Sequence, residues 1–497
     1  MQSCETLIRG ARVLDGSGDA SFEADVAIAD GMILFVNRDA AQADTVIDGT
    51  GKVLAPGFID VHSHDDTNVI RAPAMWPKLS QGVTTVIVGN CGISAAPVRL
   101  KGDPPDPMNL LGKADAFCYH DFSSYLDALE RARPAVNVAA LIGHTSLRSN
   151  HMDRLDRAAT LAEIESMRDE LREALALGAL GLSTGLAYAS AFSAPTEEVM
   201  ALAEPLAEFG GIYATHLRTE FAEILDAMDE AFRIGRRARV PVVISHLKCA
   251  GPENWGRSGE VLAALERAAR AHPVGWDCYP YTAGSSTLDL KQVTDRIEIT
   301  ITWSETHPDA GGKSLKDIAA GWRLSLLDAA RRLQPAGAIY HSMSEDDVRR
   351  ILRHPATVIG SDGLPNDPMP HPRLWGAFPR VLGKYSRDEK LFPLSEAVHK
   401  MTGLAARRFG LSGRGFIREG YAADLVLFDP ATVRDMASFA NPQRPAEGIF
   451  AVWVNGVLSS RDQSPTGARG GRFLSRGSID PADFRYAGDA AAPEIQA

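Results

Sequence analysis

Long apolar runs, cysteine and blocks of like charge are all scarce in this 497-residue sequence. No stretch reaches the roughly 20 apolar residues that a membrane-spanning helix needs, and the first residues, MQSCETLIRG, lack the features of a secretory signal. The five cysteines show no CxxC spacing, which fits a reducing compartment better than a disulfide framework. These absences make the cytoplasm the default expectation.

An excess of positive charge is also absent. The sequence has 52 Lys and Arg against 63 Asp and Glu, and the net charge of −11 comes from intermixed signs. Nucleic acids and anionic membranes attract basic patches, so neither is an expected partner. Nothing in the sequence indicates the oligomeric state. The length exceeds what one core usually fills, which favours a large domain plus a smaller one.

Apolar, strand-like runs alternate with amphipathic helical stretches through the middle of the chain, as in parallel βα units. Helix starts are indicated by capping-box spacings at Thr160 with Glu163 and at Ser344 with Asp347, and by Ser395. Eight runs are expected to be strands: 57–61, 83–88, 137–142, 181–183, 212–215, 241–245, 274–277 and 357–360. Eight such units predict a (β/α)8 TIM barrel.

The two chain ends differ from the middle, because they contain short strand-like runs without helices. Asp30-Gly31 and Asn455-Gly456 are hairpin turn signals within these ends. We expect 1–54 and 411–480 to pair into one small β-sandwich domain, and 55–410 to form the catalytic barrel. The stretch from about 285 to 338 is too long for a simple connection, so it is expected to be a lid insertion with its own helices.

Residue types that bind metals follow the carboxyl ends of five predicted strands, where the active sites of such barrels lie. Each type alone is commoner as a core, surface or turn residue, but their gathering at one level of one fold predicts a metal site. Two of them, in FIDVHSHDD, point the same way because side chains alternate along a strand. The six residues are His62, His64, Cys91, His216, His246 and Asp362.

The motifs PGFIDVHSHDD, SQGVTTVIVGNCGIS, ATHLR, ISHLKC and IGSDGLP resemble those of the amidohydrolase superfamily, and specifically of its D-aminoacylase (N-acyl-D-amino-acid deacylase) branch. The resemblance runs over nearly the whole length, through PHPRLWGAFPRVLG and MTGLAARRFGL to GYAADLVLFDP and VWVNGV. Its most specific element is Cys91 within GNCGIS, because most binuclear relatives have a carboxylated lysine as the bridging ligand.

The resemblance implies a zinc enzyme that hydrolyses the amide bond of N-acyl-D-amino acids to a carboxylate and a free D-amino acid. It implies a tight zinc site at Cys91, His216 and His246, and a second, weaker position surrounded by His62, His64 and Asp362. Asp362 would move the proton from water to the leaving nitrogen. The substrate α-carboxylate would be bound by Lys248, Tyr279, Ser285 and Arg373.

Neutral, largely apolar side chains such as D-Met, D-Leu or D-Phe are the expected substrates, although lysines and arginines of the lid leave acidic side chains as an alternative. A cyclic-amide hydrolase of the dihydropyrimidinase or hydantoinase type is the nearest rival, and Cys91 argues against it. A non-catalytic scaffold is the rival from another class, and the presence of all six ligand-type residues argues against that.

Overall fold

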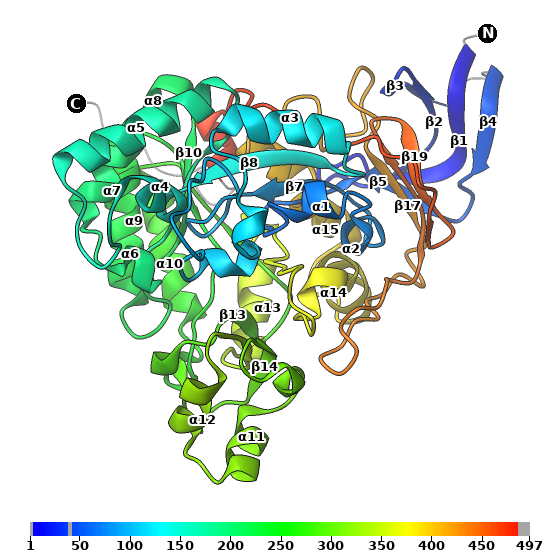
Figure 1. Cartoon of the computed structure of the whole chain (residues 1–497). Coiled ribbons are helices and arrows are strands. Elements are labelled where there is room, and N and C mark those ends of the chain that lie inside the picture. Colours follow the sequence, from blue (N-terminus) through cyan, green and yellow to red (C-terminus); the bar gives the residue numbers. More distant parts are fainter. Residues whose placement is uncertain (1–2, 38–41, 486–497) are drawn as a thin grey trace.

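The computed structural model describes residues 3–37 and 42–485. Its centre is a parallel sheet of eight strands in the order β16–β12–β11–β10–β9–β8–β7–β6, surrounded by helices (Figure 1). All eight lie where the sequence predicts strands, which confirms the barrel. They are β6 (Phe58–Asp60), β7 (Val83–Val88), β8 (Asn137–Gly143), β9 (Gly181–Gly185), β10 (Ile212–His216), β11 (Val242–Ile244), β12 (Val274–Cys278) and β16 (Thr357–Ile359).

The barrel closes between β6 and β16, just beyond the carboxyl ends of both strands. The backbone N–H of Asp362 donates to the His62 carbonyl at 2.7 Å, and that of His64 donates to the Gly363 carbonyl at 3.3 Å. Residues 60–65 and 361–363 are called the seam below. The closing contacts therefore involve three of the six residues that the sequence singles out.

The barrel helices show which start signals are reliable. Thr160 and Glu163 form the expected capping box at the start of α5 (Leu161–Ala176). Ser344 precedes α13 (Glu345–Arg353) without a capping hydrogen bond, so that capping box is wrong. The reason is that the Asp347 carboxylate accepts from Gly256 and Ser258 at the start of another helix.

The Ser395 start signal is also displaced, because α15 (Leu394–Met401) begins one residue earlier, after Pro393. The other larger helices around the barrel are α3 (Phe122–Ala132), α4 (His144–His151), α7 (Thr196–Ala203), α9 (Ile224–Ala238), α10 (Ser258–Ala269), α14 (Arg373–Arg380) and α16 (Gly403–Arg408). No helix among the described residues is long and apolar enough to cross a membrane.

The two chain ends meet in one nine-stranded sheet beside the barrel (Figure 1). Apolar side chains from both ends, among them Val26, Leu425 and Trp453, pack into one core, which fits the expected sandwich. The hairpin turns at Asp30 and Asn455 both have left-handed backbones. The strands are β1 (Ser3–Val13), β2 (Phe22–Ala29), β3 (Met32–Asn37), β4 (Gln42–Asp48), β5 (Val53–Pro56), β17 (Leu425–Phe428), β18 (Ile449–Val454), β19 (Val457–Arg461) and β20 (Ser464–Pro465).

The segment expected to be a lid projects from one side of the barrel (Figure 1). It contains the expected helices, α11 (Leu315–Trp322) and α12 (Leu326–Leu333), and an antiparallel sheet that the sequence reading missed. That sheet is β13 (Gly284–Thr287), β15 (Ala336–Tyr340) and β14 (Ile299–Ser304). The segment has an apolar core of its own. The domain boundaries at residues 54, 55, 410 and 411 stay a prediction.

Candidate metal centre and active site

The six ligand-type residues come together at the carboxyl ends of the strands. Cys91 Sγ lies 3.2 Å from His62 Nε2 and 3.3 Å from His246 Nε2. His64 Nε2 lies 3.1 Å from Asp362 Oδ1. The candidate ligand atoms form two groups, each within 4.8 Å, and Cys91 belongs to both: His62, His64, Cys91 and Asp362, and Cys91, His216 and His246.

Three of these residues have unusual backbone conformations. Cys91, His246 and Asp362 have φ angles of 54°, 37° and 50°, in the left-handed region that residues other than glycine seldom occupy. Each follows the end of its strand closely. Such strain persists only where the surrounding structure holds it, and it gathers at functional sites. Sequence periodicity cannot predict it, because the strand geometry has already ended at these positions.

Charge in the cluster is balanced internally. Burial alone would raise the pKa of the Cys91 thiol, but the neighbouring His62 and His246 outweigh it and hold that pKa well below the usual value. Burial alone would lower the pKa of His64, yet Asp362 and Cys91 raise it to about 9. Burial would raise the pKa of Asp362, and the Arg373 guanidinium together with the histidines holds it well below its usual value.

The arrangement fits a metal cation. A thiolate, imidazole nitrogens and a carboxylate are directed at one another in a buried space, where a cation would replace the protons that otherwise balance them. Within the described part of the chain, the buried His216 Nδ1 has no hydrogen-bond partner. Sulfur with nitrogen donors is a set that suits zinc.

Two acidic residues that the sequence reading missed hold the histidines in place. Asp277, at the end of β12, lies 3.2 Å from His62 Nδ1 and accepts from the His246 backbone N–H at 2.9 Å. Glu220 Oε1 lies 2.9 Å from His246 Nδ1 and 2.5 Å from Lys248 Nζ. Carboxylates behind ligand histidines fix their ring orientation. Asp277 carried a usable signal, because it ends a barrel strand.

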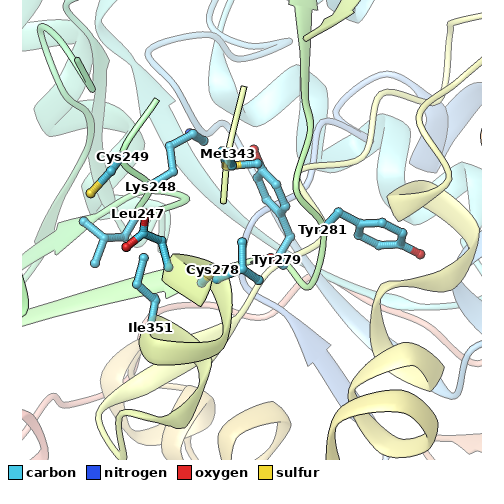
Figure 2. A pocket seen from close by; sticks show the side chains of 10 residues that line it. Leu247, Lys248, Cys249, Cys278, Tyr279, Tyr281, Met343 and Ile351 are labelled. Atoms are coloured by element: carbon cyan, nitrogen blue, oxygen red, sulfur yellow. Dashed lines mark hydrogen bonds between the residues drawn. The ribbon is translucent and has the colours of Figure 1, made fainter. Parts of the chain in front are cut away.

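Three of the four residues expected to bind the substrate lie together beside the cluster. The Arg373 guanidinium lies over the Tyr279 ring at 4.6 Å, and Lys248 Nζ lies 5.7 Å from that ring. Arg373 Nη1 is 2.8 Å from Asp362 Oδ2. Figure 2 shows Lys248 and Tyr279 extending to the same side, whereas Tyr281 turns away.

Ser285 is positioned differently from the other three. Its backbone carbonyl accepts from Arg373 Nη2 at 3.0 Å, while its hydroxyl donates to the Ala338 carbonyl within the lid sheet at 3.3 Å. A further lid contact involves Tyr188, whose ring lies 4.9 Å from that of His216 and whose hydroxyl is 3.3 Å from Ser286 Oγ. The lid therefore joins the site through β13.

Comparison with known proteins gives matches over nearly the whole chain. A family model described as the amidohydrolase family matches residues 45–459. A D-aminoacylase of Alcaligenes xylosoxydans xylosoxydans is 50% identical, covering 96% of this chain and 98% of its own. An N-acyl-D-aspartate deacylase of the same organism is 48% identical over 96% of each chain.

Solved structures agree. A D-aminoacylase crystal structure superposes with a TM-score of 0.93 at 50% identity, covering 95% of this chain and 100% of the other. The N-acyl-D-glutamate deacylase of Bordetella bronchiseptica, in complex with zinc and a phosphonate inhibitor, has a TM-score of 0.92 at 44% identity, with the same coverage.

Proposed function

Because the chain belongs to the amidohydrolase family and is a metal-dependent amidohydrolase, we propose that it uses zinc to hydrolyse N-acyl-D-amino acids to a carboxylate and a free D-amino acid. The observation that carries the proposal is the pairing of two features within one buried site. A sulfur and nitrogen ligand cluster lies directly beside a group of cationic and hydroxyl donors suited to a carboxylate.

The tight zinc site is assigned to Cys91, His216 and His246, because a thiolate with two imidazoles is a strong set for this metal. The second, weaker position is assigned to His62, His64 and Asp362, with Cys91 shared. When bound, zinc would lower the pKa of water to about 7 and polarise the scissile carbonyl. Asp277 and Glu220 would keep the histidine rings oriented toward it.

Asp362 is assigned the proton transfer. Its carboxylate lies between His64 Nε2 and Arg373 Nη1, at 3.1 and 2.8 Å, and these neighbours favour its ionised form. An ionised carboxylate can take the proton of the attacking water. The same group can then return the proton to the leaving nitrogen, as amide hydrolysis requires.

The substrate α-carboxylate is assigned to Arg373, Lys248 and Tyr279. Arg373 and Tyr279 are buried, and in the described part of the chain neither Arg373 Nε nor the Tyr279 hydroxyl has a hydrogen-bond partner. Buried donors without acceptors are costly, so a bound anion would satisfy them. Ser285 would act on this set through its backbone carbonyl, which already holds Arg373.

Stereochemistry follows from two fixed points. If the α-carboxylate is bound by Arg373 and the acyl carbonyl faces the metal cluster, the side chains of D- and L-substrates must leave the α-carbon in different directions. A site with rigid, chiral surroundings can accommodate the side chain in only one of these directions. We therefore expect the D-series to be hydrolysed and the L-series to be poor substrates.

Neutral, apolar D-amino acids are favoured over acidic ones, because three cations of the lid are exposed and already engaged. Arg296 pairs with Glu253, and Lys313 pairs with Asp309. Lys291 lies 5.2 Å from the exposed Phe192 ring. A buried side-chain carboxylate without a partner would cost more than an extra methylene gains, so the two substrate classes should separate clearly.

The test is kcat/KM of the zinc-loaded enzyme on N-acetyl-D-Met, D-Leu, D-Phe, D-Glu and D-Asp, on their L-counterparts and on dihydrouracil. Turnover of the neutral D-series is the expected result. Preference for D-Glu or D-Asp would overturn the assignment of apolar substrates. Preference for the L-series would overturn the stereochemical assignment, and preference for dihydrouracil would overturn the proposed reaction.

A further inference from the structure

A lysine lies buried inside the protein next to the seam, although nothing in its sequence context indicates a function. Lys78 belongs to the short helix α2 (Trp76–Leu79) and is fully buried. Its Nζ lies 2.7 Å from Asp60 Oδ2, 2.9 Å from Ser361 Oγ and 3.2 Å from Asp65 Oδ2. One ammonium thus contacts both sides of the seam.

The partners of Lys78 hold the backbone on which the second metal position is built. Asp60 Oδ1 accepts from the backbone N–H of Ser361 at 2.8 Å and from that of His62 at 3.3 Å. The Ser361 hydroxyl donates to Asp60 Oδ2 at 2.6 Å. Asp60 therefore joins the segment that carries His62 to the segment that carries Asp362.

Asp65 completes the cluster from the far end of the HxH segment. Its Oδ2 accepts from the Ser63 hydroxyl at 2.5 Å and lies next to the Lys78 ammonium. Lys78 is thus the common cation of two buried carboxylates that flank His62 and His64 in sequence. Without it, the two carboxylates would face each other in a low-dielectric interior, where like charges repel strongly.

The position of Lys78 and its partners explains why side-chain contacts are needed at the seam. Elsewhere in the barrel, neighbouring strands are joined by hydrogen-bonded ladders. At the seam, β6 and β16 share no ladder in the described structure, and the junction consists of an isolated bridge at Ser63 and Gly363 with a few backbone contacts. Side-chain interactions must therefore supply the registration that strand pairing supplies elsewhere.

We propose that Lys78 is a positioning residue for the second metal position and for Asp362: with Asp60, Asp65 and Ser361 it fixes the spacing between His62, His64 and Asp362 across the seam. The expected effect on kcat rests on the proposed function, whereas the role of Lys78 in fixing the spacing across the seam does not. In the described structure, Lys78 contacts Asp60, Asp65 and Ser361, none of which is assigned as a metal ligand or a substrate donor, so its effect passes through the seam.

Lys78→Met, which keeps an unbranched side chain shorter by one atom and removes the charge, is the main test. Lys400→Met is the matched control, because Lys400 is also fully buried and paired with Glu396 at 3.2 Å, and its ammonium donates to the His354 carbonyl before β16 instead of to a residue of the seam. With N-acetyl-D-Met, Lys78→Met should lose kcat on the order of 10²-fold with little change in KM, since small displacements of catalytic groups carry such losses. Lys400→Met should keep both constants.

Zinc titration gives a readout that does not depend on the substrate. Lys78→Met should keep the zinc assigned to Cys91, His216 and His246 and bind a second equivalent more weakly than the parent enzyme. If no N-acetyl-D-amino acid is turned over, the proposed function fails, and the zinc titration alone then tests the role of Lys78. Equal binding of the second equivalent in both proteins, including none in either, then overturns the role of Lys78.

Two further variants keep the test decisive if Lys78→Met folds poorly. Ser361→Ala leaves the charges in place and removes one link, so it should show a smaller loss of kcat with unchanged KM. The double variant Lys78→Met/Asp65→Asn removes one of the two carboxylates that lose their cation, and it should recover part of the lost kcat. The inference would be overturned if both Lys78→Met and Ser361→Ala kept the wild-type kcat. It would also be overturned if Lys78→Met and Lys400→Met lost kcat equally.

Discussion

Charged side chains at the barrel mouth differ from those of the lid in a way that separates their roles. At the mouth, Arg373 is fully buried and in contact with Asp362. In the lid, the side chains of Arg296 and Arg331 are each 57% exposed, and their ion pairs lie at the surface. Exposed ion pairs contribute about 0–1 kcal/mol, whereas buried charges have strong and directional effects.

This difference indicates that the barrel supplies the charges of the chemistry and the lid supplies shape and backbone contacts. The lid reaches the site through β13, where the Ser285 carbonyl accepts from Arg373 and Ser286 contacts Tyr188. The lid also has a separate apolar core, so its fold does not depend on the metal cluster. Replacements at the centre of the barrel mouth should therefore have larger effects on turnover than replacements of lid charges.

Cys91→Ala should have the largest effect, because Cys91 belongs to both groups of candidate ligands. Loss of the shared thiolate should abolish both zinc binding and turnover. Metal content by mass spectrometry and kcat on N-acetyl-D-Met measure this. Cys4→Ala, a change at a buried cysteine in the terminal sheet, is the control and should keep both. Full zinc occupancy with normal turnover in Cys91→Ala would contradict the assignment.

Asp362→Asn should keep most of the zinc and lose kcat by at least the order of 10²-fold, because an amide cannot carry the proton. Asp347→Asn is a suitable control, since Asp347 is a buried aspartate that bonds Ser258 at the start of α10. Its change should lower stability and leave kcat intact. Near-normal kcat in a folded, zinc-loaded Asp362→Asn enzyme would move the proton transfer to another group.

Much of the barrel mouth can be predicted from the sequence, because the signals are local. Short buried strands end in His, Cys or Asp, so the fold places these residues at one level. Glu220 and Lys78 are harder to find, and for Asp277 the strand end indicates its place but not its partner. Asp277 lies 215 positions from His62, and only the closed barrel brings them together. Their side chains respond to partners that no nearby pattern reveals.

Local signals also fail where a tertiary partner competes. Ser344 and Asp347 have the spacing of a capping box, but Asp347 bonds the start of α10 instead. Lys248 lies two residues after His246, and its Nζ is 2.8 Å from His246 Nδ1, as the alternation of a strand would place it, although β11 has already ended at Ile244. Tyr281 lies two residues after Tyr279, where a continuing strand would point it the same way, but it turns away because β12 has ended (Figure 2).

The α-carboxylate donors give the third prediction. Lys248→Ala and Arg373→Ala should weaken N-acetyl-D-amino acids more than the corresponding carboxamides, which lack the negative charge. Arg373 also contacts Asp362, so part of its loss should be common to both substrates. The cleanest variant is Tyr279→Phe, which removes only a buried hydroxyl without a partner in the described chain. Comparison of kcat/KM on acid and amide measures the difference.

Equal losses on acid and amide for all three variants would show that these residues support the structure instead of binding the carboxylate. Replacements of lid cations supply the contrast within the same experiment. Arg296→Ala and Lys313→Ala remove exposed charges that are paired at the surface, so the ratio of acid to amide turnover should not change. A change in that ratio would assign the lid a direct electrostatic role.

Asp367 is a buried acidic residue in contact with the lid, unlike the exposed lid charges, and its replacement should have the smallest effect of these variants. It lies on the loop between Asp362 and Arg373 and is buried near Thr302 and Trp303 of the lid. Burial raises the pKa of Asp367 to about 7, although Thr302, Arg373 and Trp303 act in the opposite direction. Unlike Asp362, this carboxyl is therefore held in its neutral form in mildly acidic solution.

The sign of the resulting pH dependence follows from linkage. Between the ordinary aspartate pKa of about 4 and the raised pKa of about 7, the folded chain binds a proton at Asp367 that the unfolded chain releases. Its contribution to stability is complete below the lower value and is lost as the pH rises through the upper one. Asp367→Asn remains neutral throughout, so the melting temperature of the variant minus that of the parent should increase between about pH 5 and about pH 8.

Asp309→Asn, at an exposed lid carboxylate, should show no such trend. Each unit of pKa difference corresponds to about 1.4 kcal/mol, so the trend is measurable by thermal scanning. A difference that stays constant with pH would mean that Asp367 is ionised in the folded protein. The buried carboxylate at the border between barrel and lid would then be charged, like that of Asp362 at the barrel mouth.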